Sequence, residues 1–426
     1  MKKSFKKILI ARTDVIGDMV LTLPVFEAVA KKYPEAKIYV LCKQLTRPLL
    51  MNNPYIYEIL VEEDRKLINN ARKLRYYRFD LFIGVWEDPY YAALSFFAGI
   101  KYRIGYRVNL FSYLFYSKSK PFPWKNNILH QIDYNLGVLS LIGINVFKSD
   151  YPPRLYGYSK IIKNEKIVIA VGSKEKNRYW RPSLFVEVIN YLLKNYKLEI
   201  ELIGGPDELK IGEYFDSKVK SNKLINSISK LSLEQTIKVI ASAKYFLGAD
   251  SGPMHIAAAL NVPMVCLFFT KNQKPLRLGP WNTRHILLKA KYQCPDVCRS
   301  TFCKKDICAT AITPEQVCNE LHELFTGHGK INNIDYWLEL SLNVLYISDN
   351  NFDNQKNILV KPYSLKKLKQ TVITNNINVI HVIAKKPRIW WKFIQLWLSN
   401  FISVYPKVLF SLNKNTKELY KNEYIN

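Results

Sequence analysis

The chain has 426 residues, of which 48% are hydrophobic and 13% aromatic, so disorder along its whole length is excluded and two or three folded domains are expected. Its 63 Lys and Arg against 35 Asp and Glu give a formal charge of +28, which indicates an anionic partner: nucleic acid, an acidic membrane surface or a phosphorylated substrate. No apolar run is long enough to span a membrane, and the run at 8–11 is too short for a signal peptide. We therefore expect a cytoplasmic protein with reduced cysteines.

Short apolar runs alternate with helical patterns, which is typical of parallel α/β sheets. Strands are expected at 7–11, 38–41, 56–61 and 79–85, with a helix over 20–33. Two prolines and a glycine break the pattern at 150–157. It then restarts with strands at 166–171, 199–203, 245–247 and 262–269, and helices at 183–196, 233–242 and 254–260. The sequence predicts two such halves facing each other across a cleft.

The composition changes after a second break at 326–330. The predicted domains are therefore 1–155, 165–328 and a C-terminal α/β appendage at 331–426. The appendage contains strand candidates at 344–347 and 379–383 and an aromatic helix candidate at 389–404. That helix could lie in a membrane interface or pack against the body of the protein.

A polar loop, RTDVIGD, spans residues 12–18 directly after the first strand. A strand, a loop with a glycine and a helix together expose backbone N–H groups, which form a natural anion site. Asp18 in this loop is a candidate general base for an acceptor hydroxyl. The alternative is that Asp18 only caps the following helix.

Three loops of the second half also follow predicted strands. The loop at 248–255 (GADSGPMH) can offer helix N–H groups to a diphosphate, although Asp-Ser-Gly-Pro also suits an ordinary helix cap. The loop at 172–182 holds four basic residues that can neutralise a phosphate, unless it is simply solvated. The loop at 204–208 (GGPDE) offers carboxylates to a ribose or is an ordinary turn. Because all four loops fall at carboxyl ends of strands, we expect them to form one site.

Three stretches resemble the heptosyltransferase family of lipopolysaccharide synthesis, which is glycosyltransferase family 9 with the GT-B fold. They are ILIARTDVIGDMVLTLPVFEAVAKKYP at 8–34, KNRYWRP at 176–182 and FLGADSGPMHIAAALNVPMVCLF at 246–268. The resemblance covers roughly residues 7–325. Two departures are the missing Pro-Gly before Ser173 and Asp14 in place of a serine. The resemblance implies two Rossmann-like domains facing across a cleft.

It also implies inverting, metal-independent transfer of heptose from ADP-heptose to a lipid-linked core sugar, without a cofactor. Asp18 would be the general base. The donor would be bound by Lys176, Arg178, Asp207 or Glu208, Asp250, Ser251, Gly252 and His255. The acceptor would be bound by the loop residues Thr13, Asp14 and Gly17. A basic cluster that includes Arg72 and Arg75 would also face an acidic acceptor, unless it is only a solvated basic surface. The expected partners are a nucleotide sugar, an anionic lipid-linked glycan and the cytoplasmic face of the inner membrane, where the protein would bind peripherally.

Other interpretations stay open at this point. The chain could be a GT-B transferase for another sugar nucleotide or a basic nucleic-acid-binding protein, although no nucleic-acid partner is expected because the candidate chemistry clusters in strand-end loops. Four cysteines, Cys294, Cys298, Cys303 and Cys308, could bind zinc or serve a local structural role.

Overall fold

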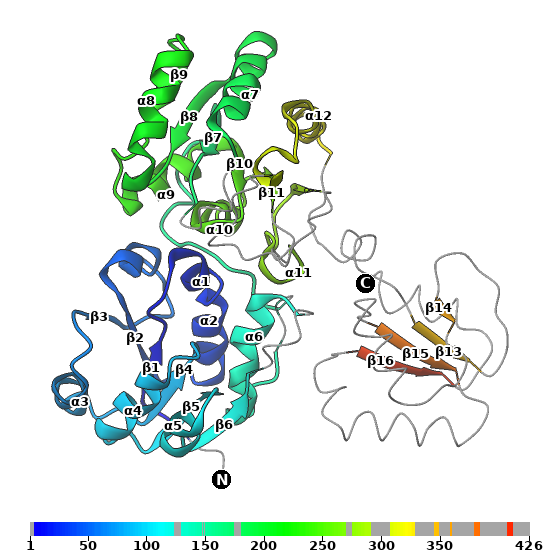
Figure 1. Ribbon diagram of the computed structural model, residues 1–426. Helices are drawn as coiled ribbons and strands as arrows, with labels where there is room; N and C mark the ends of the chain where they lie inside the picture. The colour runs from blue at the N-terminus through cyan, green and yellow to red at the C-terminus, as the bar shows by residue number, and fades with distance from the viewer. Residues whose placement is uncertain are drawn as a thin grey trace. The chain divides into compact units, whose positions relative to one another are not determined.

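The computed structural model describes residues 4–122, 129–146, 148, 150–173, 180–269, 275–290 and 307–328, together with strands of the tail. The chain divides into two compact units. The first, Met1–Phe122 with His130–Asn332, contains two six-stranded sheets, and the second, Pro123–Leu129 with Asn333–Asn426, contains a four-stranded sheet (Figure 1).

The first sheet is parallel throughout, in the order β3-β2-β1-β4-β5-β6. Its strands are β1 (Lys7–Ala11), β2 (Lys37–Lys43), β3 (Glu58–Glu62), β4 (Leu81–Gly84), β5 (Tyr102–Arg107) and β6 (Lys118–Pro121). Its helices are α1 (Ile16–Val20), α2 (Leu23–Lys32), α3 (Leu67–Arg75), α4 (Pro89–Phe97), α5 (Leu110–Phe115) and α6 (Gln131–Gly137), with 3-10 turns η1 (Gln44–Leu49) and η2 (Val138–Ile142). We call the segment from β1 to α6 the first lobe. Central β1 is fully buried over Ile8–Ile10, as expected for a parallel strand that is covered on both faces.

The second sheet is also parallel, in the order β12-β11-β10-β7-β8-β9. Its strands are β7 (Asn164–Ala170), β8 (Glu199–Ile203), β9 (Leu224–Asn226), β10 (Ala243–Ala249), β11 (Met264–Phe268) and β12 (His285–Lys289). Its helices are α7 (Pro182–Asn195), α8 (Leu209–Lys218), α9 (Leu233–Ala241), α10 (Gly252–Ala259), α11 (Pro275–Leu278) and α12 (Pro314–Phe325), with 3-10 turns η4 (Pro206–Glu208) and η5 (Ile307–Thr310). We call the segment from β7 to α12 the second lobe. Its core gathers around the buried Trp180, Phe185 and Phe215.

Both sheets have the same topology, because counting the second from β7 gives the strand order of the first. In each, the order reverses beside the central strand, between β1 and β4 and between β7 and β10. Ligands of such sheets bind outside the carboxyl ends of the strands at this reversal. The fold therefore directs attention to the loops after these four strands. The predicted pair of parallel α/β sheets is confirmed.

Some elements differ from the sequence prediction. The helix expected over 20–33 is α2, which begins at Leu23 with Pro24 in its first turn, where a missing N–H is tolerated. A separate short helix, α1, begins at Ile16, within the residues expected to form a loop. Strands β5 and β6 were not predicted. Both carry Lys or Arg, and β6 ends in a proline, which an edge strand tolerates.

The tail forms a parallel sheet in the order β14-β13-β15-β16. Its strands are β13 (Leu345–Ser348), β14 (Ile358–Leu359), β15 (Val379–Ile383) and β16 (Lys407–Ser411), so both expected strands are present and two more join them. The aromatic segment 389–404 lies outside the described residues. The domain limits 155, 165, 328 and 331 stay predictions. In the part of the chain that the structure describes, no helix is both long and apolar enough to cross a membrane.

Candidate active site at the strand ends

A buried arginine organises the loop after β1. Arg12 Nε donates to Asp14 Oδ1 at 2.8 Å, and Arg12 Nη2 lies 2.6 Å from Asp14 Oδ2 and 3.0 Å from Asp18 Oδ1. Arg12 Nη1 also donates to the carbonyl of Val85, just beyond β4, at 3.4 Å. One guanidinium therefore holds two carboxylates across the point where the strand order reverses. A planar, always charged fork suits this role.

Asp18 is the exposed member of this cluster. Its side chain is 30% exposed, against 11% for Asp14 and 3% for Arg12. Helix α1 has Val15 as its N-cap and no side-chain cap, so Asp18 does not cap the helix but pairs with Arg12. Of the two acids that Arg12 holds, Asp18 is the one that an acceptor hydroxyl can readily reach.

Thr13 takes a different place from the one that the sequence suggested. Its side chain is fully buried, and its hydroxyl donates to the phenol oxygen of Tyr91. Tyr91 in turn donates to the carboxylate of Glu62, at 2.9 Å from each oxygen. The Thr13 hydroxyl is therefore engaged with Tyr91 inside the protein, and its contact with an acceptor stays a prediction.

The loop after β10 carries the second candidate motif. Asp250 and His255 are 2% and 5% exposed, and both have polar or electrostatic contacts. Ser251 is the N-cap of α10, but its hydroxyl donates to the carbonyl of Ala249 at 3.2 Å rather than capping the helix. The first-turn N–H groups of α10 are thus not capped by the Ser251 side chain, which suits an anion at this end.

The two motifs meet where α1 packs on α10. A Cβ atom added at Gly17 would lie 2.8 Å from His255 Cδ2, and one added at Gly252 would lie 2.8 Å from Ile16 Cγ2. Both positions need glycine because the helices approach so closely. The structure therefore brings Gly17 and the 250–255 loop together. Ile16 fills the space where a side chain at position 252 would stand.

A second contact joins the lobes beside the first. Arg277 Nε of α11 donates to Gln131 Oε1 at 2.9 Å, and the His130 ring lies 3.0 Å from the carbonyl of Gly279 through Nε2. Burial lowers the pKa of His130 well below its usual value, so the ring is neutral and Nε2 carries the donated proton. These residues were not predicted, because their sequence separation gives no signal.

Glu208 and Asp207, which the sequence could not tell apart, occupy different environments. Glu208 Oε2 accepts the Gly205 N–H at 2.6 Å, and its carboxylate lies so close to Gly172 that a side chain there would collide. Burial raises the pKa of Glu208, whereas Asp207 is exposed. Glu208 is therefore the acid at the ends of β7 and β8.

A family model for glycosyltransferase family 9 (heptosyltransferase) matches residues 68–306, which is more than half of the chain. The chain belongs to glycosyltransferase family 9. The lipopolysaccharide heptosyltransferase 3 of Escherichia coli is 26% identical over 301 residues, covering 63% of this chain and 85% of the relative. The lipopolysaccharide heptosyltransferase 2 of Salmonella typhimurium is 24% identical over 360 residues, covering 76% of this chain and 99% of the relative.

Solved structures show the same fold as this family 9 glycosyltransferase. The ADP-heptose lps heptosyltransferase II of Escherichia coli matches with a TM-score of 0.63 at 22% identity, covering 75% of this chain and 98% of that one. A family 9 glycosyltransferase of Veillonella parvula matches with a TM-score of 0.66 at 19% identity, covering 77% and 99%. The predicted family and the predicted GT-B fold are confirmed.

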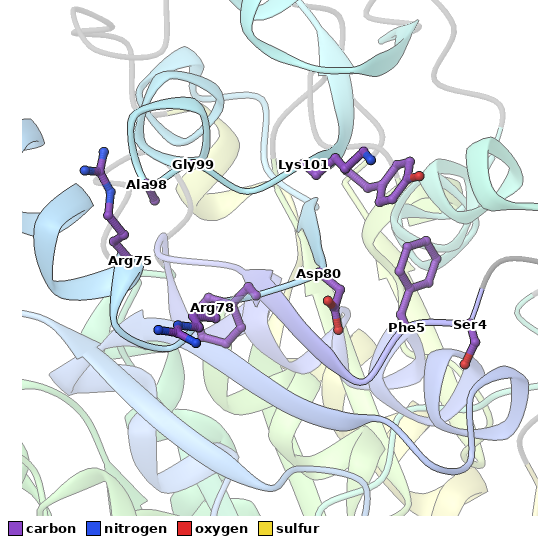
Figure 2. Close-up of a pocket in the computed structure, with 10 residues that line it drawn as sticks. Ser4, Phe5, Arg75, Arg78, Asp80, Ala98, Gly99 and Lys101 are labelled. Atoms are coloured by element: carbon purple, nitrogen blue, oxygen red, sulfur yellow. The ribbon is translucent and has the colours of Figure 1, made fainter.

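Two basic residues expected at the acceptor lie on α3 of the glycosyltransferase. Arg72 is exposed, and Arg75 Nη2 donates to the carbonyl of Phe97 at 2.9 Å. Arg75 also lines a pocket of about 420 Å³ with Asp80 and Lys101, which precede β4 and β5 (Figure 2). This pocket is at the amino ends of the strands, whereas Asp18 follows a carboxyl end. The structure therefore does not bring Arg75 to Asp18, and acceptor binding by Arg72 and Arg75 stays a prediction.

Lys176 and Arg178 lie outside the described residues, as do Cys294, Cys298 and Cys303. Among the described residues, no group of three or more His, Cys, Asp or Glu side chains could hold a metal ion. Cys308 is half-buried, and the zinc interpretation stays a prediction.

Glu87 is an acid of the site that sequence reasoning missed. Burial raises its pKa, and Arg12 and Arg277 oppose that shift. The charge of Asp18 adds to the rise in the pKa of Glu87, so the two acids lie in the same cluster. The signal was available, since Glu87 follows the predicted strand 79–85 just as Asp18 follows the first strand.

Asp14 predicts a pH dependence of the glycosyltransferase. Burial raises the pKa of Asp14 to about 6, although Arg12 opposes the shift. As the pH falls through about 6, Asp14 takes up a proton and no longer forms an ion pair with Arg12. We expect the kcat of the wild type to fall over this range, as measured by initial rates against pH. This fall should be absent from the pH profile of Asp14→Asn. If the fall in kcat persists in Asp14→Asn but disappears in Glu87→Gln, protonation of Glu87 causes it instead.

Proposed function

We propose that the protein transfers heptose from ADP-heptose to a lipid-linked lipopolysaccharide core sugar, with inversion and without a metal ion. The relatives named above are lipopolysaccharide heptosyltransferases, and a heptosyltransferase WaaC of Escherichia coli with a TM-score of 0.60 was solved with ADP. The observation that carries the proposal is the placement of an accessible carboxylate, Asp18, on α1, which packs on the N-terminal turn of α10.

Asp18 acts as the general base in this proposal. It takes the proton from the acceptor hydroxyl while the hydroxyl oxygen forms a bond to the anomeric carbon. The bond from that carbon to the diphosphate breaks on the opposite face, so the configuration inverts and ADP leaves. Arg12 orients Asp18 through the 3.0 Å contact and does not itself meet the substrate, because it is buried.

The second lobe stabilises the leaving diphosphate. The first turn of α10 supplies backbone N–H groups from Ser251 and Gly252, and Lys176 and Arg178 are proposed to add positive charge. Asp250 and His255 would line the donor sugar, and Glu208 would reach the ribose. Backbone and basic side chains can carry this charge without Mg²⁺.

The acceptor is proposed to be an anionic, lipid-linked glycan at the cytoplasmic face of the inner membrane. The charge of +28 favours such a partner. Asp14 and Gly17 belong to the proposed acceptor-binding loop. Asp14 forms an ion pair with Arg12, and Gly17 has no side chain that would collide with His255 of α10.

Donor binding tests this proposal. We expect ADP to bind more tightly than UDP, by isothermal calorimetry, and ADP-heptose to support transfer to a core acceptor, by mass spectrometry of the product. Glu208→Gln is expected to raise the Kd for ADP about 10-fold, because a ribose hydroxyl loses a charged acceptor. The matched control, Asp207→Asn, changes an exposed neighbour and should leave the Kd unaltered.

Tighter UDP binding, or transfer from a UDP-sugar alone, would contradict the heptose donor while leaving a GT-B transferase in place. Equal effects of the two substitutions would remove Glu208 from the ribose site.

A further inference from the structure

The helices α4 and α5 of the first lobe present large apolar side chains to solvent. In α5, Leu110, Phe111 and Leu114 are 67%, 62% and 59% exposed. At the end of α4, Phe96 and Phe97 are also exposed. Soluble proteins rarely expose neighbouring apolar groups of this size without a binding role.

These side chains belong to one surface, which we call the α4–α5 patch: Phe96, Phe97, Leu110, Phe111, Tyr113 and Leu114. The ring of Phe115 connects it, with centroids 5.1 Å from Phe96, 5.9 Å from Phe97 and 6.4 Å from Phe111. The two helices contact each other at the lower end of the first lobe in Figure 1.

Hydrogen bonds from arginines hold the patch in place. Arg103 Nε donates to the carbonyl of Phe115 at 2.7 Å, and Arg75 Nη2 donates to that of Phe97 at 2.9 Å. The ends of both helices are thus fixed to neighbouring elements. The backbone that carries the apolar side chains is therefore anchored at these two helix ends.

Positive charge borders the patch. The segment 89–122 has no Asp or Glu, and its basic residues are Lys101, Arg103, Arg107, Lys118 and Lys120. The guanidinium carbon of Arg103 lies 5.2 Å from the Phe96 ring centroid, and that of Arg107 lies 5.3 Å from the Tyr113 centroid. The adjoining pocket adds Arg75 and Arg78 (Figure 2). Of the ten residues that line this pocket, three are basic and one, Asp80, is acidic.

We propose that the α4–α5 patch docks the protein on an anionic phospholipid bilayer. Apolar side chains enter the interface while the basic border meets lipid phosphates, the combination that binds peripheral proteins to such membranes. A second copy of this chain fits less well, because two copies related by symmetry would bring like charges together.

The inference deepens the proposed function, since it names the surface that reaches the lipid of the acceptor. Arg107 ends β5, and the Asp18 loop follows β1 at the same edge of the parallel sheet. The basic border therefore extends from the patch toward the carboxyl ends of the strands, where the Asp18 loop lies. Docking itself requires neither donor nor transfer.

Cosedimentation of the full chain with vesicles tests the patch. We expect the wild type to bind phosphatidylcholine vesicles that contain about one third phosphatidylglycerol, and to bind pure phosphatidylcholine far less. The variant Leu110→Ser/Phe111→Ser/Leu114→Ser should lower the apparent partition constant at least about 10-fold, because it removes the inserted apolar area. Lys101→Gln/Arg107→Gln/Lys118→Gln should lower binding and flatten its salt dependence.

The control is Leu209→Ser/Ile225→Ser, which changes side chains that are 50% and 41% exposed on the second lobe and should leave vesicle binding unchanged. Unaltered binding by the Leu110, Phe111 and Leu114 variant overturns the proposal, as does a wild type that binds neutral vesicles equally well or none at all. Conversion of a wild-type dimer to a monomer by that variant, without a change in vesicle binding, would make the patch a self-association face. The affinity for ADP should be the same in these variants as in the wild type. A wild type that does not bind ADP would contradict the proposed function and would leave the docking proposal untouched.

Discussion

Asp18→Asn is expected to abolish most transfer while leaving donor binding intact. The substitution keeps the size of the side chain and removes its ability to take a proton. Because a positioned general base contributes typically about 10²–10⁴-fold to a rate, kcat should fall within that range. The Kd for ADP should change little, since Asp18 lies on the first lobe and its ion pair is with Arg12. Single-turnover rates and calorimetric ADP titration measure the two quantities separately.

Asp64→Asn is the matched control, because Asp64 is an exposed acid of the same lobe that pairs with Lys66 instead of Arg12. Its kcat should equal that of the wild type. Full activity in Asp18→Asn would remove Asp18 from the mechanism. A parallel loss of ADP affinity and kcat would indicate that Asp18 matters for how α1 meets α10 rather than for proton transfer.

The sequence was sufficient to predict which loops lie at the carboxyl ends of the strands, because parallel sheets obey a simple rule. Asp18, Glu208 and the 250–255 loop all follow strands, and the carboxyl ends of parallel strands share an edge. The same rule could have placed Arg75 correctly. The basic residues of α3 lead directly into β4, so they must lie near the amino end of that strand, where the structure has them. Charge count alone does not distinguish the two edges of a sheet.

Contacts between distant segments could not be predicted. The packing of Gly17 in α1 on His255 in α10 joins helices of the two lobes, and it depends on how the lobes meet. Likewise, the loop sequence RTDVIGD contains Arg12, Asp14 and Asp18, but spacing does not reveal that one guanidinium contacts both acids. The role of Thr13 depends on Tyr91, which comes from a helix that the pattern did not indicate.

Arg12→Ala is expected to destabilise the protein and to stop transfer. The substitution removes the buried cation that pairs with Asp14. It also leaves the negative charges of Asp18 and Glu87 without the nearby positive charge of Arg12. Breaking a buried ion pair from one side typically costs about 3–5 kcal/mol, so urea denaturation should show a loss of that order. Arg65→Ala is the control, because Arg65 pairs with Asp88 but is 51% exposed, and such pairs contribute about 1 kcal/mol or less.

The pH dependence of this loss separates charge from packing. A carboxyl whose pKa is raised by folding contributes stability in its neutral form, and this contribution is lost as the pH rises through the folded pKa. Since burial already raises the pKa of Asp14 to about 6, and Arg12 opposes that shift, removing Arg12 must raise it further. The destabilisation of Arg12→Ala should therefore be largest above neutral pH and shrink in mildly acidic solution, where Asp14 and Glu87 can be neutral. A loss of equal size at every pH would mean that Arg12 stabilises the loop by packing alone, and Asp18 would then owe its orientation to the backbone of α1.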